Sequence, residues 1–122
     1  TLVGVLRMLG AAGANVFALP EADPLARRSR WYRPGPARLA GVTPETLAGV
    51  LDCLPDQTVL VPCSDAWAAA VASLPAEVAR RYPASVASPA ALETLIDKAL
   101  LSRALDRLDL PHPLTRPGIS LQ

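Results

Sequence analysis

The stretch Thr58-Val-Leu-Val-Pro62-Cys63-Ser64-Asp65 decides the fold that we expect for this chain. Its first half is a short apolar run without alternation, which is typical of a parallel strand covered on both faces. Ser64 or Asp65 then provides the N-cap of a helix expected over 66–74. A buried strand that leads directly into a helix is the repeating step of an α/β fold.

The same succession recurs along the chain. A helix expected over 2–12 ends before Gly13, which suits the left-handed position after a helix, and the apolar run Asn15–Leu19 follows. Short strands are also expected at 31–33 and 85–87, and further helices at 44–54, 75–80, 89–95 and 97–108. The sequence therefore predicts a Rossmann-like parallel sheet with helices on both faces.

Three helix starts share one chemistry, an N-cap acceptor followed by proline: Asp23-Pro24, Thr43-Pro44 and Ser88-Pro89. The strand and glycine-rich turn that normally open a Rossmann-like domain are missing from the chain. The chain also begins without Met on a helical pattern. We therefore expect it to be an excerpt of a longer protein.

Length and composition restrict the function classes. The chain has 122 residues, 51% of them hydrophobic, and a net charge of +1, which fits one domain with a real core and no nucleic-acid footprint. No apolar stretch is long enough to span a membrane. Cys53 and Cys63 have neither metal-ligand nor disulfide-framework spacing, so we expect buried, reduced thiols in a cytoplasmic protein.

Lys98 is the first candidate binding residue, because it is the only lysine beside eleven arginines. A lysine offers a compact point charge suited to a phosphate contact, whereas arginine offers a rigid fork. It directly follows Asp97 at an expected helix start, where a cation opposes the helix dipole unless an anion is near. The alternative is an ordinary solvated helix lysine.

Ser64, Asp65 and Arg30 are the remaining candidates. Ser64 and Asp65 follow a predicted strand, where ligands of parallel sheets bind, although plain helix capping explains them equally well. Arg30 closes the basic cluster Arg27-Arg28-Ser29-Arg30, which is either a solvated face or a grip for a phosphate or carboxylate. No residue is assigned a catalytic or metal-binding role.

Two other site chemistries are disfavoured. Dinucleotide binding needs a glycine-rich loop before the first helix, and the spacing of Gly4, Gly10 and Gly13 does not supply one. A nucleophilic Cys63 would need a nearby base, and His112, the only histidine, lies in a proline-rich turn.

The order of these segments resembles the start of an ATP-grasp protein. The pair Asp97-Lys98 opens a helix that ends in Pro111-His-Pro113-Leu-Thr115, which is similar to the junction where the ATP-grasp fold begins. Segments 4–16, 26–32 and 59–65 resemble the preceding pre-ATP-grasp domain. The resemblance covers about residues 2–115 and is closest to the carbamoyl-phosphate-synthase-like and carboxylate–amine ligase branches.

The resemblance implies a pre-ATP-grasp domain over 1–110, followed over 111–122 by a linker and the start of the ATP-grasp domain. The parent protein would be an ATP-dependent ligase that activates a carboxylate as an acylphosphate for attack by an amine. Lys98 would contact the ATP phosphates, and Ser64, Asp65 and Arg30 would face substrate. The ligands of Mg²⁺ would lie in the part that follows, so the fragment alone would be inactive.

Two alternatives stay open beside the ligase. The first is a non-catalytic Rossmann-like module that binds a nucleotide or a protein. The second is a thiol enzyme, which would require a lowered pKa at Cys63. The carboxylate, the amine and the oligomeric state are not set by the sequence, with a homodimer as one candidate.

Overall fold

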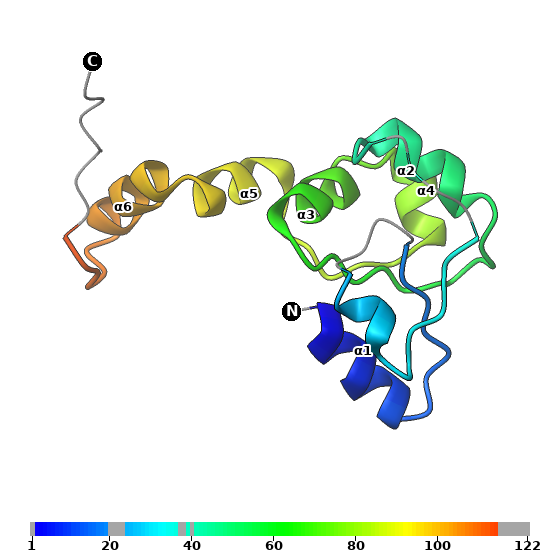
Figure 1. Cartoon of the computed structure of the whole chain (residues 1–122). Helices are drawn as coiled ribbons and strands as arrows, with labels where there is room; N and C mark the ends of the chain where they lie inside the picture. Colours follow the sequence, from blue (N-terminus) through cyan, green and yellow to red (C-terminus); the bar gives the residue numbers. More distant parts are fainter. Residues whose placement is uncertain (1, 20–23, 37–38, 40, 115–122) are drawn as a thin grey trace, which may run out of the picture. The chain divides into compact units, whose positions relative to one another are not determined.

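The computed structural model of the chain describes residues 2–19, 24–36, 39 and 41–114. It divides into two compact units, Thr1–Ser85 and Val86–Gln122. Figure 1 shows the helices of both units along the chain. The predicted domain boundary at residue 110 stays a prediction, and the predicted helix start at Asp23 lies outside the described residues.

The predicted sheet is wrong. The described residues form six α-helices and one short 3₁₀ helix, and no strand is among them. The predicted strand segments are extended, but they meet only in two isolated parallel bridges, Ala18 with Pro34 and Leu60 with Ala84. Prolines stand two places after Ala18 and Leu60, at Pro20 and Pro62, and a proline has no N–H to donate to the next rung.

The first unit begins with α1 (Leu2–Ala11), which ends as predicted at a left-handed glycine, Gly13, with a φ of 81°. The N–H of Ala14 bonds to the carbonyl of Leu9, and that of Gly13 bonds to Gly10, the pattern of a Schellman motif. Leu6 of α1 is fully buried and packs with Ala18 and with Ala26 of the 3₁₀ helix η1 (Ala26–Arg28).

The rest of the first unit holds α2 (Pro44–Leu51), α3 (Asp65–Ala72) and α4 (Ala76–Arg81). Thr43 caps α2 through a capping box with Thr46, and proline stands in its first turn, as the sequence predicts. α2 and α3 pack on each other, and their buried residues are Leu47, Val50, Leu51, Ala70 and Val71.

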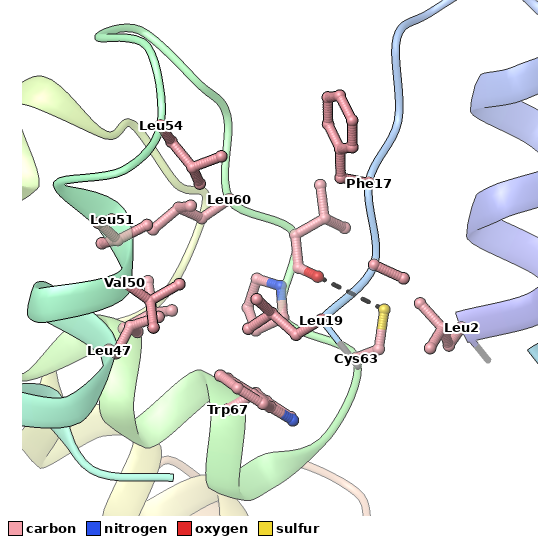
Figure 2. Close-up of a pocket in the computed structure, with 14 residues that line it drawn as sticks. Leu2, Phe17, Leu19, Leu47, Val50, Leu51, Leu54, Leu60, Cys63 and Trp67 are labelled. Carbon is pink, nitrogen blue, oxygen red and sulfur yellow. Dashed lines mark hydrogen bonds between the residues drawn. The ribbon is translucent and has the colours of Figure 1, made fainter. Parts of the chain in front are cut away.

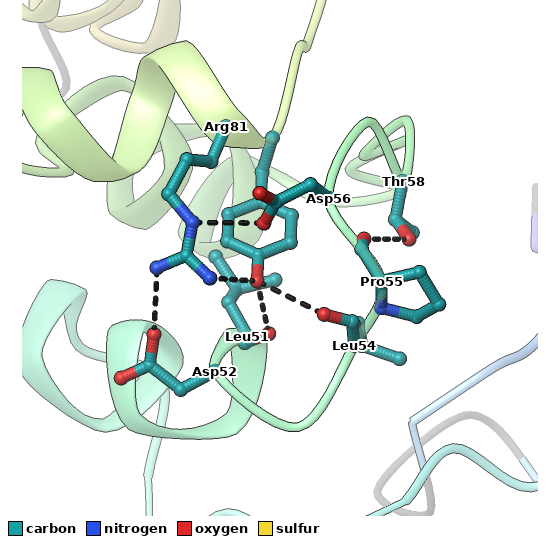
Figure 3. A network of polar contacts seen from close by, with 8 residues as sticks. Leu51, Asp52, Leu54, Pro55, Asp56, Thr58 and Arg81 are labelled. Atoms are coloured by element: carbon teal, nitrogen blue, oxygen red, sulfur yellow. Dashed lines mark hydrogen bonds and ion pairs between the residues drawn. The ribbon is translucent and has the colours of Figure 1, made fainter.

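Arg81 and Tyr82, at the end of α4, make polar contacts with the end of α2 and the residues that follow it. Figure 3 shows the contacts of Arg81. Arg81 bonds to Asp52 at 3.1 Å and to Asp56 at 2.8 Å. These ion pairs are half exposed, so their contribution to stability is small. Tyr82 is buried, and its hydroxyl donates hydrogen bonds to the carbonyl of Leu51, the last residue of α2, and to the carbonyl of Leu54.

The second unit contains α5 (Pro89–Ile96) and α6 (Lys98–Arg107), which contact each other. Ser88 caps α5 and Asp97 caps α6, at the two helix starts that the sequence predicts. Across the described parts of both units, every helix is too short or too polar to cross a bilayer.

Candidate functional site

Arg30 lies beside a basic pocket in the first unit. Three arginines line it, Arg7 from α1, Arg28 from η1 and Arg30 itself, together with Val3, Leu25, Ser29 and Trp31. The pocket is open to solvent and has a volume of about 560 Å³. It forms because η1 packs against α1, which brings an arginine of the first helix to the cluster near residue 28.

The charge in this pocket is not neutralised by the described part of the chain. The guanidinium of Arg30 stacks over the ring of Trp31 at 4.7 Å, and none of Arg7, Arg28 or Arg30 forms an ion pair with a described residue. Guanidinium groups bind carboxylates and phosphates through paired hydrogen bonds. The arrangement is therefore suited to a carboxylate or phosphate group, with Trp31 as an apolar wall.

Ser64 and Asp65 stand together at the start of α3. The hydroxyl of Ser64 accepts a hydrogen bond from the backbone N–H of Trp67 at 3.5 Å, which makes Ser64 the N-cap. Asp65 is the first residue of the helix, and both side chains are exposed. Their geometry is that of ordinary capping, and Asp65 forms no ion pair with a described residue.

An apolar pocket lies next to this helix start, and Figure 2 shows its walls. Two extended segments line it, 17–19 and 60–63, with side chains from three helices. The helix side chains are Leu2 of α1, Leu47, Val50 and Leu51 of α2, and Trp67 and Val71 of α3. Its cavity volume is about 170 Å³, and nothing charged lines it. We call it the apolar groove.

Cys63 lines the apolar groove, and its chemistry argues against a thiol enzyme. Burial raises the pKa of the thiol above its ordinary value of 9.0, whereas a nucleophilic cysteine needs a lowered one. Its Sγ donates to the carbonyl of Val61 at 3.4 Å. Both cysteines are free, but Cys53 is exposed and Cys63 is only partly buried, so the expectation of two buried thiols is wrong.

Lys98 belongs to the second unit, where it is the first residue of α6 and exposed. The carboxylate of Asp97 accepts from the N–H groups of Ala99 at 2.8 Å and Leu100 at 3.1 Å. Asp97 thus already satisfies two of the free N–H groups of this helix end. An anion bound here would be held by the ammonium group of Lys98 rather than by the backbone.

The structure brings Ser64 and Asp65 together and places Arg30 in a separate pocket of the same unit. Lys98 lies in the other unit. Arg7 and the apolar groove were not predicted from the sequence. Arg7 lies near the arginine cluster because η1 packs against α1, and no spacing within the sequence indicates that packing. No group of three His, Cys, Asp or Glu side chains within the described ranges could hold a metal ion.

Comparisons with known proteins give no match: no family model, no curated protein and no solved structure matches this chain.

Proposed function

We propose that this chain is part of a cytoplasmic ATP-dependent ligase that activates a carboxylate as an acylphosphate for attack by an amine. Lys98 would contact the ATP phosphates, in the presence of Mg²⁺. Two things support the proposal: the sequence resemblance to ATP-grasp proteins and the local geometry at Asp97 and Lys98.

The geometry at the start of α6 is the observation that carries this proposal. Asp97 caps the helix with its carboxylate, so the only lysine of the chain stands at the first helical position with an exposed side chain. The cap offsets the unfavourable interaction of a cation with the helix dipole. A point charge in this place can neutralise charge on a phosphoryl group during its transfer.

The arginine pocket fits the carboxylate substrate in the same proposal. Arg7, Arg28 and Arg30 carry charges without a described counter-ion, and the carboxylate of a small acid matches the fork geometry of a guanidinium. Ser64 and Asp65 stay candidate substrate contacts on the strength of the resemblance. The substrates proposed are therefore a small carboxylic acid and an amine.

The test is calorimetric titration of Mg²⁺-ATP into the longest natural form of the protein that contains this chain. We expect Lys98→Ala to weaken binding about tenfold or more. Arg80→Ala is the matched control, because it also replaces an exposed cation by alanine, but in the first unit. If Lys98→Ala and the unmutated protein bind Mg²⁺-ATP with equal affinity, Lys98 is an ordinary surface residue.

A non-catalytic module that binds an anionic small molecule is the second candidate function. The arginine pocket favours it, since this site needs no second domain to be complete. The two candidates differ in turnover. Release of ADP and phosphate that depends on a carboxylate and an amine supports the ligase, whereas binding without turnover supports the module.

A further inference from the structure

The apolar groove is flanked by two extended segments that are each paired on one side. On one side of the groove, the N–H of Ala18 donates to the carbonyl of Arg33 at 2.9 Å, and the carbonyl of Ala18 accepts from Gly35 at 2.8 Å. On the other, the N–H of Leu60 donates to the carbonyl of Pro83 at 2.8 Å. Neither partner segment lines the groove, whereas Phe17, Leu19 and Val61 do.

The unpaired sides carry two rows of backbone groups. In an extended chain, the N–H and C=O groups of successive residues point to opposite sides. Those of Phe17 and Leu19 therefore point away from the segment of Arg33, and those of Val59 and Val61 point away from Pro83. Among the described residues these four have no backbone partner, and only the carbonyl of Val61 accepts a bond, from the thiol of Cys63.

Apolar side chains surround these backbone groups. Phe17 and Val61 are 49% and 48% exposed, although both line the groove. Leu2, Leu47 and Trp67 contribute to the wall from three helices (Figure 2). An occupant must therefore satisfy backbone donors and acceptors on both flanks and also cover an apolar surface.

We propose that the apolar groove binds an extended, apolar peptide segment of a partner protein, which adds as a strand between segments 17–19 and 59–61. Three-residue edges at about 3.3 Å per residue match a segment of about three or four residues. The main chain of the segment supplies the hydrogen bonds, and its side chains supply the apolar contacts. The inference is independent of the ligase proposal.

Other occupants fit the groove less well. A small apolar molecule covers the walls but leaves the backbone N–H and C=O groups without partners, which is costly once water is excluded. A second copy of this chain could pair edge to edge, but its own segment would then satisfy one row and not both. An inserted peptide strand is the occupant that satisfies both rows.

The probe is the peptide acetyl-Arg-Val-Leu-Val-Val-Arg-amide, titrated into the full chain. Binding should slow amide hydrogen exchange about tenfold or more at Phe17, Leu19, Val59 or Val61, on both flanks of the groove. The matched control is the same peptide with N-methyl groups on its two central residues. It keeps the apolar side chains and loses backbone donors, so it should bind at least tenfold more weakly.

A pair of valine variants provides the second test. Val61→Asp places a charge in the groove and should weaken binding of the probe at least tenfold. Val42→Asp makes the same change at an exposed valine that does not line the groove, and it should leave binding unchanged. Three results would overturn the proposal: no binding, equal binding of the N-methylated peptide, or protection of one flank through self-association. The peptide comparison uses the unmutated chain, so it holds even if Val61→Asp fails to fold.

Discussion

The hydroxyl of Tyr82 donates a hydrogen bond to the backbone carbonyl of Leu51 over 2.6 Å, which links the end of α4 to the end of α2 (Figure 3). The carbonyl of Leu54 accepts from the same hydroxyl at 3.1 Å. Tyr82 is 1% exposed, so this polar group lies inside the first unit with its hydrogen bonds made. The ring fills space in the interior of the unit, while the hydroxyl provides a hydrogen-bond donor for backbone carbonyls at and after the end of α2.

Tyr82→Phe should therefore destabilise the chain by about 1–2 kcal/mol. The carbonyl of Leu51 keeps a bond from the N–H of Leu54, but the carbonyl of Leu54 loses its described partner. The measurement is the free energy of unfolding in urea. Tyr32→Phe is the control, because its hydroxyl makes no described hydrogen bond, and it should change stability by less than about 0.5 kcal/mol. Equal losses from the two variants would contradict the assignment.

Gly10 and Gly4 of α1 should respond in opposite directions to alanine. A Cβ at Gly10 would lie 2.6–2.8 Å from ring atoms of Trp31, whereas a Cβ at Gly4 would meet nothing within 4 Å. Gly10→Ala should cost about 1–3 kcal/mol through overpacking. Gly4→Ala should stabilise by about 0.5–1 kcal/mol, because alanine is the better helix former.

The two glycine variants control each other, since both make the same change in the same helix. Thermal unfolding followed by circular dichroism measures them side by side. If Gly10→Ala is as stable as Gly4→Ala, then Trp31 moves aside at little cost and the close packing of α1 on the segment near residue 31 is not required.

The helices were predictable because their signals are local. Thr43-Pro44, Ser88-Pro89 and Asp97 are caps that act within one turn of the helix they begin, and all three stand where the sequence places them. The sheet was not predictable in this way. Apolar runs such as Asn15–Leu19 indicate an extended, apolar segment, but pairing depends on a distant partner and on available N–H groups, which Pro62 lacks.

The candidate sites also differ in whether local sequence signals or contacts between distant segments create them. The place of Lys98 at a capped helix start follows from its immediate neighbours in the sequence, above all Asp97, so it could be predicted. The arginine pocket depends on the packing of η1 against α1, and the apolar groove depends on two extended segments and three helices. No short-range pattern encodes such convergence, so Arg7 and the groove emerged only from the structure.

His112 should titrate above its ordinary pKa. Its Nε2 lies 2.9 Å from the carboxylate of Asp106, and its Nδ1 lies 3.0 Å from the carbonyl of Pro113. These two hydrogen bonds, the first being the larger cause, raise the pKa of His112 above 6.5, because the charged ring can donate from both nitrogens. The contribution to folding is then complete below pH 6.5 and is lost as the pH rises through the folded pKa.

Proton NMR measures this directly, because His112 is the only histidine in the chain. Asp106→Asn should lower the pKa of His112 toward 6.5, and added salt should reduce the difference between the two proteins. Asp109→Asn is the control, since no described contact joins its side chain to the ring. An unchanged titration in Asp106→Asn would mean that the pair does not form in solution.

Variants at Asp97 and Lys98 separate the effect of the helix cap from the effect of the lysine charge. Asp97→Ala removes the acceptor for the N–H groups of Ala99 and Leu100 and should destabilise α6 by about 1 kcal/mol. Asp97→Asn keeps a capping oxygen and should cost much less, whereas Lys98→Ala should leave helicity unchanged or slightly raised, because a cation leaves the positive end of the helix dipole. Circular dichroism and amide exchange at Ala99 and Leu100 measure both effects. A loss of helix in Lys98→Ala would mean that any fall in ATP affinity came from unfolding of α6, whereas intact helix with weakened binding would assign the loss to the ammonium group itself.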